Sequence, residues 1–288
     1  MADRPYVELI EVGPRDGLQN DPVAIPVAEK IALVDALSSV GFKRIEVGSF
    51  VSPRWVPQMA GSAEVMNGIT RAKGTSYTAL TPNMQGFEAA VAAGADGVAV
   101  FASASEGFSR ANVNASIDDS LARFPEVVAR AASAGLPVRG HISCVTDCPY
   151  DGPVQPEAVL RVALALDDMG CADISLGDTI GQGTPEAVDH LLATLLDHLP
   201  PDRLAGHFHD TAGRALENVG VCLSRGLRMF DGSVGGLGGC PFAPGAAGNV
   251  ATGALAGYLD AAGFSHGIDL DRLNAAASIA RSLRKAPA

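Results

Sequence analysis

Two hydrophobic patterns alternate along the chain. Short apolar runs bounded by turn residues are typical of buried strands, and eight of them occur, at Val7–Val12, Arg44–Val47, Ser76–Leu80, Gly97–Phe101, Val138–Ser143, Asp173–Leu176, Leu204–His209 and Met229–Ser233. Alanine-rich segments between them predict helices at Val27–Val40, Gln85–Ala93, Ile117–Ala134, Pro156–Met169, Pro185–Leu199 and Ala215–Arg225. Several of these helices reach a glycine where a left-handed C-cap is expected, namely Gly41, Gly94, Gly135, Gly170 and Gly226.

This alternation predicts an α/β fold in which parallel strands are joined by helices. Closing eight such units into a (β/α)8 TIM barrel is the simplest way to bury them, although repetition alone does not exclude an open, doubly wound sheet. The chain has 288 residues, which is usual for one barrel, and no linker interrupts it, so we expect a single catalytic domain over residues 1–288. The helical segment Leu270–Leu283 is additional to the repeats and is expected against the barrel or at a subunit contact.

Composition narrows the classes of partner and environment. The net charge is −11 and there is no basic block, which argues against a nucleic-acid partner. No apolar stretch approaches the length of a membrane span. The five cysteines show no disulfide-framework spacing, and the first residues lack the pattern of a signal or transit peptide. We therefore expect a reduced, cytoplasmic protein.

The stretch RLAGHFHD, residues 203–210, carries the most informative motif. Side chains two apart on a strand point to the same face, so His207 and His209 stack along one face with Asp210 just beyond. Neutral imidazoles and a carboxylate together suit a first-row divalent cation. Taken alone, such a pair of histidines is more often hydrated on an exposed strand. A metal site is favoured only because the fold is expected to bring further candidate residues close to the pair.

In a TIM barrel the chemistry gathers at the carboxyl ends of the strands. The first strand is followed by GPRDGLQN, which holds Arg15 and Asp16, and in a closed barrel this strand lies near the seventh. One carboxylate and two imidazoles leave room for water or substrate, which suits Mg²⁺ or Mn²⁺ as a Lewis acid. Arg15 beside such a site would stabilise an enolate or carboxylate oxygen. For Asp16 alone, an Asx turn or a salt bridge to Arg15 is the simpler explanation.

Two further elements have more than one interpretation. Glu46 on an inner strand face is a candidate general base or a partner of Arg15, and a buried ion pair without a chemical role fits almost as well. The glycine-rich loop Ser233–Asn249 indicates unusual backbone angles or movement, and we interpret it as a lid that carries Cys240 over the substrate; the alternative is a surface loop with an inert thiol. Packing is the role expected of Cys144 and Cys148, and no role is assigned to His141, His190, His198 and His266.

The chain resembles the 3-hydroxy-3-methylglutaryl-CoA lyases, among the metal-dependent barrel lyases and Claisen-type synthases, in the motifs GPRDGLQN, SFVSPRWVPQM, LTPN, SLGDTIGQGTP, GHFHDT and GGLGGCPFAPGAAGN. The resemblance covers nearly the whole chain, and the Cys240 loop is particular to the lyases. It implies that the ligands of a divalent cation are Asp16, His207, His209 and Asn249. It also implies that Arg15 stabilises the enolate, that Cys240 is the general acid/base, and that Glu46 and Asp178 take part in the active site.

The activity implied by the resemblance is a metal-assisted retro-Claisen cleavage of an acyl-CoA substrate. A base takes the proton of the tertiary C3 hydroxyl, the C2–C3 bond breaks to release acetoacetate, and the thioester enolate, held by Arg15, is protonated to acetyl-CoA. The implied setting is leucine degradation, and the implied assembly is a homodimer.

Two departures from the family open alternatives. Gly48 stands where the family usually has threonine, so that the pocket could be larger or a hydroxyl contact could be lost. Asp21-Pro22 stands where the family often has a basic residue that could help to bind CoA. Gly48 motivates a lyase of the same mechanism that acts on a 3-hydroxyglutaryl-CoA with a longer C3 substituent. A Claisen-type synthase is less compatible with the short chain and the Cys240 loop. A metal-binding scaffold without activity would require the whole set of site residues to be accidental.

Overall fold

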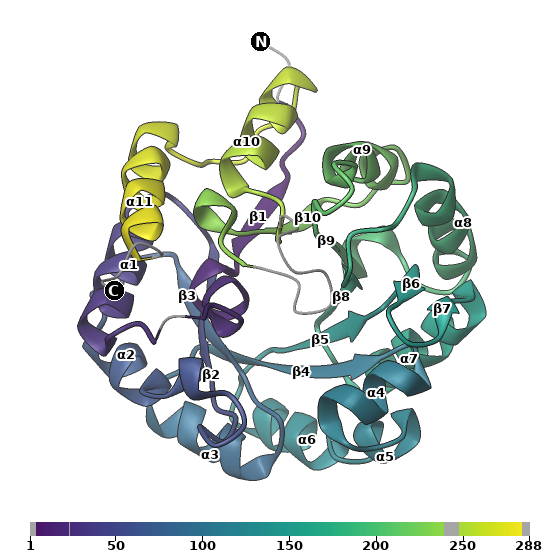
Figure 1. Cartoon of the computed structure of the whole chain (residues 1–288), viewed down its shortest axis with the longest axis horizontal. Coiled ribbons are helices and arrows are strands. Elements are labelled where there is room, and N and C mark those ends of the chain that lie inside the picture. The colour runs from purple at the N-terminus through teal and green to yellow at the C-terminus, as the bar shows by residue number, and fades with distance from the viewer. Residues whose placement is uncertain (1–3, 23, 239–247, 284–288) are drawn as a thin grey trace.

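A computed structural model describes residues 4–22, 24–238 and 248–283. Eight parallel strands form a closed barrel in the order β1-β10-β9-β8-β5-β4-β3-β2, and helices surround it (Figure 1). The barrel strands are β1 (Glu8–Glu11), β2 (Arg44–Ser49), β3 (Ser76–Leu80), β4 (Gly97–Ser103), β5 (Val138–Ser143), β8 (Asp173–Asp178), β9 (Leu204–Phe208) and β10 (Met229–Gly232). A small antiparallel hairpin is made by β6 (Asp147–Cys148) and β7 (Gly152–Pro153). All eight predicted strands are present, and the TIM barrel is confirmed.

Helices cover the outside of the barrel. They are α1 (Val27–Ser38), α2 (Ser62–Gly68), α3 (Met84–Ala92), α4 (Glu106–Val113), α5 (Ile117–Leu121), α6 (Pro125–Ser133), α7 (Pro156–Met169), α8 (Pro185–Leu196), α9 (Ala215–Ser224), α10 (Thr252–Ala261) and α11 (Leu270–Leu283). Short helical turns are η1 (Gly13–Gly17), η2 (Pro57–Met59), η3 (Pro201–Arg203) and η4 (Val234–Gly236). The sequence did not predict α2, α4 or α10. The five expected C-cap glycines all have left-handed backbone angles, with φ from 71° to 108°.

One predicted helix is wrong in its extent. The segment Ile117–Ala134 forms two helices, α5 and α6, rather than one. Pro125 occupies the first turn of α6, because proline has no N–H to bond to the preceding turn and its ring clashes there. The helical periodicity continues across the break, which is why the pattern alone suggested a single helix.

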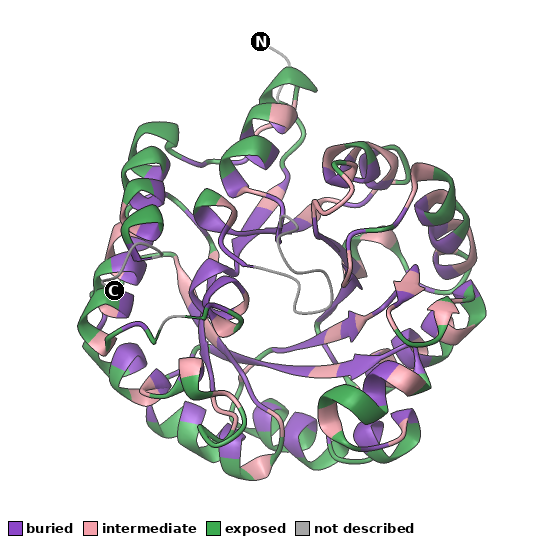
Figure 2. Cartoon of the chain, viewed as in Figure 1, coloured by how far each residue is buried: buried purple, intermediate pink, exposed green. Residues whose placement is uncertain are grey.

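The core lies between the barrel wall and the inner faces of the helices (Figure 2). In α7 the buried residues follow helical spacing, at Val159, Val162, Ala163 and Leu166. The additional helix α11 lies against α1, where Arg272 donates a hydrogen bond to the Ser39 carbonyl at 2.8 Å. Within the described ranges no helix is long and apolar enough to cross a membrane. The four cysteines described are buried free thiols.

The strand order sets up the site. β10 separates β1 from β9, so the turn after the first strand of the chain lies near the end of the seventh barrel strand, as the sequence predicted. Within the sheet, Asp231 of β10 is the register partner of His207 of β9. Side chains from the turn after β1 and from the end of β9 therefore meet at one end of the barrel.

Candidate metal centre and active site

The turn after β1 presents Arg15 and Asp16 side by side. The N–H groups of Asp16 and Gly17 both bond to the Val12 carbonyl, at 2.7 and 3.3 Å, which gives the widened turn of a π-helix. Gly17 permits the turn, because a Cβ there would lie 2.7 Å from the Leu237 Cβ. Single π-turns are frequent at functional sites, and this one aims two charged side chains into the barrel mouth.

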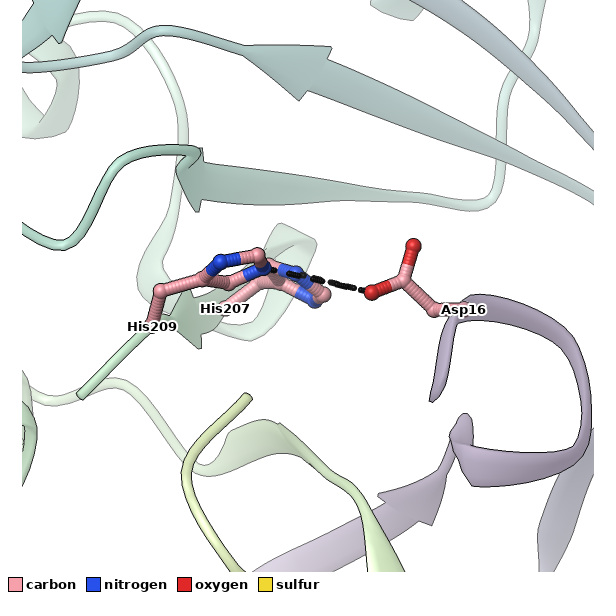
Figure 3. A group of neighbouring side chains, drawn as sticks. All are labelled: Asp16, His207 and His209. Carbon is pink, nitrogen blue, oxygen red and sulfur yellow. Dashed lines mark ion pairs between the residues drawn. The ribbon is translucent and has the colours of Figure 1, made fainter. Parts of the chain in front are cut away.

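Asp16, His207 and His209 form a possible metal-binding triad (Figure 3). The Asp16 Oδ2 atom is 3.9 Å from the Nε2 atom of each histidine, and the three candidate ligand atoms lie within 4.8 Å of one another. Two ligands of one ion are separated by at most twice the metal–ligand distance, about 4.2 Å for Mg²⁺. The 3.9 Å separations therefore fit a shared cation with small adjustments. Within the described part of the chain, these three residues are the group of histidine, cysteine and acidic side chains close enough together to hold one metal ion.

Two of the three triad side chains have pKa shifts that favour the form that binds a cation, and the third, His207, is shifted the other way. Burial, together with the neighbouring His207, lowers the pKa of His209 to about 4, so its imidazole is neutral at pH 7 and has a lone pair to share. Burial would lower the pKa of His207 as well, but a hydrogen bond to Asp231 and the charge of Asp16 raise it. Burial would raise the pKa of Asp16, but Arg15 and the two histidines hold it well below its usual range.

Asn249 lies beside the triad. Its Nδ2 atom donates a hydrogen bond to Asp16 Oδ2 at 2.7 Å, and its backbone forms an antiparallel bridge with His209. A half-turn of the carboxamide would place its oxygen where its nitrogen now lies. The position of Asn249 therefore supports its predicted part in the ligand set, and coordination by it stays a prediction.

Glu46 is the buried ion-pair partner of Arg15. The Glu46 Oε2 atom accepts a hydrogen bond from Arg15 Nε at 2.8 Å and lies 2.7 Å from Arg15 Nη2. Burial would raise the pKa of Glu46, but Arg15 and His141 lower it to about 2. So acidic a carboxyl group is a weak proton acceptor. Of the three roles left open by the sequence, the ion pair and the lowered pKa favour a partner of Arg15, or a buried ion pair without a chemical role, over a general base. The part of Glu46 in catalysis stays a prediction.

Asp178 ends β8 and shapes the loop that follows. It accepts hydrogen bonds from Thr146 Oγ1 at 3.1 Å and from the backbone N–H groups of Gln182 and Gly183 at 3.2 and 3.0 Å. Burial raises the pKa of Asp178 despite these bonds. It is a better proton acceptor than Glu46, and its part in catalysis stays a prediction.

Cys240 lies outside the described residues, and the residues on either side of that segment lie near Asn249 and Asp210. A Cβ on Gly238 would lie 2.9 Å from Asn249 Nδ2. At the other end, the Gly248 carbonyl accepts a hydrogen bond from the Asp210 N–H at 2.8 Å. Asp210 itself is not part of the triad, because its side chain accepts from the Ala215 N–H at the start of α9.

The expectation that Gly48 enlarges the pocket is wrong. The register of β2 against β3 shifts between Glu46 and Gly48, and such an irregularity breaks the alternation of faces. A Cβ on Gly48 would lie 2.7 Å from Ser62 Oγ, between β2 and α2. The missing side chain therefore opens no space at the site.

Two site residues were missed by sequence reasoning. His141 Nε2 lies 3.5 Å from Glu46 Oε1, although no role was assigned to this histidine. Asp231 Oδ2 lies 3.1 Å from His207 Nδ1, although the sequence marked it only as part of a strand. The signal that could have identified Asp231 is its position as an acidic residue inside an otherwise apolar strand, MFDGS.

Charged side chains inside the barrel leave a negative excess that a divalent cation would balance. The network is linked by ion pairs at 2.5 to 3.9 Å. Its acidic members are Glu8, Asp16, Glu46, Asp173 and Asp231, against the arginines Arg15, Arg44 and Arg139. Because uncompensated buried charge is costly, this excess agrees with a cation at the triad.

The barrel and the triad at its mouth fit the class of TIM-barrel proteins that bind a divalent cation. The model of the HMGL-like family matches residues 6–279. The chain is 54% identical over 265 residues to hydroxymethylglutaryl-CoA lyase of Pseudomonas mevalonii, covering 92% of this chain and 88% of that protein. It is 55% identical to the 3-hydroxy-3-isohexenylglutaryl-CoA/hydroxymethylglutaryl-CoA lyase of Pseudomonas aeruginosa, covering 93% and 89%.

Solved structures agree. The HMG-CoA lyase from Brucella melitensis matches with a TM-score of 0.97 and 56% identity over 98% of this chain and 99% of that one. An HMG-CoA lyase from A. baumannii, in complex with coenzyme A and 3-methylmalate, matches with a TM-score of 0.91 and 37% identity over 97% and 91%. The chain belongs to the HMGL-like family, and the resemblance found in the sequence motifs is confirmed.

Proposed function

We propose that the chain is a carbon–carbon lyase that cleaves 3-hydroxy-3-methylglutaryl-CoA into acetyl-CoA and acetoacetate. The observation that carries this proposal is the triad of Asp16, His207 and His209, in a chain 54% identical to a hydroxymethylglutaryl-CoA lyase. The acyl-CoA substrate is further supported by the relative that was crystallised with coenzyme A.

The cofactor in this proposal is Mg²⁺ or Mn²⁺, held by Asp16, His207, His209 and Asn249. When bound, the cation supplies a positive charge that stabilises negative charge on substrate oxygens. Two imidazoles and two oxygen ligands leave further positions for the substrate. A closed structural zinc site would instead use four protein ligands, mostly thiolate or imidazole.

The side chains of this chain have distinct tasks in the cleavage. A base removes the proton of the C3 hydroxyl, and the electron pair of the C2–C3 bond moves into the thioester, which becomes an enolate. Arg15 donates hydrogen bonds to the enolate oxygen, while Glu46 and Asp16 hold its guanidinium in place. Protonation at C2, for which Cys240 is the proposed acid, gives acetyl-CoA. Asp178 is the proposed proton acceptor, because it stands at the carboxyl end of β8 and its pKa is raised.

A second candidate substrate carries a longer C3 substituent. The Pseudomonas aeruginosa relative is named for both the isohexenyl and the methyl substrate. Gly48 no longer supports this alternative, because its missing side chain does not face the site. The methyl substrate is therefore our first choice.

The test compares both substrates with the purified protein. Each acyl-CoA is incubated with Mg²⁺, with Mn²⁺ and with EDTA, and the acetyl-CoA and the keto acid released are measured. We expect equal amounts of acetyl-CoA and acetoacetate from the methyl substrate, only with metal. Release from the isohexenyl substrate alone would change the assigned acyl group, and no release from either substrate would overturn the proposal. Light scattering would test the expected homodimer.

A further inference from the structure

We propose that Asp231 is a positioning residue that fixes the tautomer of His207; this inference rests on the proposed cation site. Asp231 on β10 lies opposite His207 on β9 in the sheet register. Its Oδ2 atom is 3.1 Å from His207 Nδ1, and its side chain is fully buried, at 0% exposure.

The contact decides which ring nitrogen is free to bind a cation. An ionised carboxylate can only accept hydrogen bonds, so His207 must carry its proton on Nδ1 when the ring is neutral. The lone pair is then on Nε2, the atom that faces Asp16 at 3.9 Å. Carboxylates behind metal-binding histidines commonly act in this way. Asp231 therefore prepares His207 as a ligand before any cation arrives.

Two other side chains fix the orientation of the Asp231 carboxylate. Arg139 Nη1 lies 2.9 Å from Asp231 Oδ1, and the Ser175 hydroxyl donates a hydrogen bond to Asp231 Oδ2 at 2.8 Å. Arg139 is itself paired with Asp173, at 2.9 Å from Nε to Oδ1. One carboxylate oxygen is thus committed to the guanidinium, and the other faces both Ser175 and His207.

This arrangement predicts that Asp231→Asn weakens cation binding more than Asp231→Ala does. The guanidinium of Arg139 has only donors, so an Asp231→Asn amide would turn its oxygen toward Arg139 and its NH2 group toward His207. The ring would then have to accept at Nδ1 and carry its proton on Nε2, where the lone pair is needed. Asp231→Ala imposes no tautomer. If Asp231 had a merely structural role, Asp231→Ala would weaken cation binding more than Asp231→Asn, because asparagine preserves the shape of aspartate.

The first measurement is the tautomer itself, in metal-free protein labelled with ¹⁵N at histidine. Long-range ¹H–¹⁵N spectra at about pH 9, where a histidine ring is neutral, distinguish the two tautomers, and His207→Gln assigns the signal. We expect the Nδ1–H form in the parent and the Nε2–H form in Asp231→Asn. Ser175→Ala is the matched control, because it keeps the carboxylate, and it should show the parent form. The same tautomer in the parent and in Asp231→Asn would overturn the proposal.

The second measurement is Mn²⁺ affinity by electron paramagnetic resonance. We expect the order parent, Asp231→Ala, Asp231→Asn, with a loss of about 10- to 100-fold from parent to Asn. Binding by Asp231→Asn as tight as by Asp231→Ala would contradict the proposal. If Asp231→Ala does not fold, the tautomers of the parent and Asp231→Asn decide. Neither readout needs turnover, so a failure of the proposed reaction remains distinguishable from a failure of this inference.

Discussion

Arg15 and Glu46, 31 residues apart in the chain, are joined in a buried ion pair in which Nε and Nη2 of the arginine both contact Glu46 Oε2, at 2.8 and 2.7 Å. The third guanidinium nitrogen, Nη1, contacts Asp16. The arginine is therefore held between the candidate metal centre and a carboxylate of the barrel wall. Its orientation is fixed before a substrate binds, which is what electrostatic stabilisation of an enolate requires.

Replacing Arg15 should separate catalysis from cation binding. Arg15→Gln is expected to lower kcat by about 10²- to 10³-fold, the usual effect of losing one such donor. Mn²⁺ should bind at least as tightly, because a positive charge beside Asp16 is removed. The single variant leaves Glu46 buried without its partner, at a cost of about 3–5 kcal/mol, so Arg15→Gln/Glu46→Gln serves as a stability-matched control. A kcat within a factor of about two of the parent in both variants would exclude the enolate role.

The pH dependence of the free energy of unfolding should reveal the raised pKa of Glu11. This fully buried carboxyl accepts the N–H groups of Gly13 and Val234, each at 2.8 Å, and the Thr252 hydroxyl at 2.7 Å. Burial raises its pKa from 4.5 to about 7 despite these bonds. Because the folded state holds the proton more tightly than the unfolded state, this group stabilises the fold below pH 4.5. That contribution is lost as the pH rises through about 7, and its size is on the order of 3 kcal/mol.

Glu11→Gln mimics the protonated acid and removes this dependence. Urea unfolding of the parent and the variant between about pH 4.5 and 8 isolates Glu11, because the other titrating groups are common to both. The free energy of unfolding of the parent, minus that of the variant, should fall with rising pH and level off above about pH 7. A difference that is constant with pH would show that Glu11 is ionised throughout.

Cys240→Ser should slow turnover while cation binding is kept. The proposed role of the thiol is to transfer a proton, and positioned acids and bases contribute about 10²- to 10⁴-fold. A kcat at least about 100-fold lower with an unchanged Mn²⁺ affinity is expected. Cys171→Ser is the control at a buried thiol of the core. Turnover by Cys240→Ser equal to that of the control would remove this cysteine from the mechanism.

Gly48→Thr should affect stability and not substrate choice. The new Cβ would lie 2.7 Å from Ser62 Oγ and 3.0 Å from its Cβ, and overpacking of this kind costs about 1–3 kcal/mol. Gly48→Thr/Ser62→Gly should recover part of that loss in thermal melts. The ratio of kcat/KM for the methyl and isohexenyl substrates should be the same in the parent and the double variant. A changed ratio would restore Gly48 as a determinant of specificity.

The sequence predicted those parts of the fold that are encoded locally. Apolar runs and left-handed glycines mark the strands and helix ends, because backbone angles and burial depend on neighbouring residues. The break at Pro125 was missed because the helical periodicity of apolar residues continues across it. The helix α2 was missed because it is too short to show a periodicity.

The site was predicted only where a motif carries it. Arg15, Asp16, His207 and His209 stand in two compact motifs, and the barrel topology brings those motifs together. The pairing of Asp231 with His207 depends on how β10 aligns with β9, and the contact of His141 with Glu46 depends on both strands facing one interior. Neither relationship has a local signature, because strand register is set by packing across the whole barrel.

The most direct test of the account is to measure cation binding and turnover in one sample. Metal-free protein is titrated with Mn²⁺ while bound ion and acetoacetate release from 3-hydroxy-3-methylglutaryl-CoA are followed together, in the parent, in His209→Ala and in the surface control His190→Ala. We expect one ion per chain and a rate proportional to bound ion in the parent and the control. In His209→Ala we expect an affinity at least about 10- to 100-fold weaker. Turnover that persists in EDTA, or binding that survives His209→Ala unchanged, would contradict it.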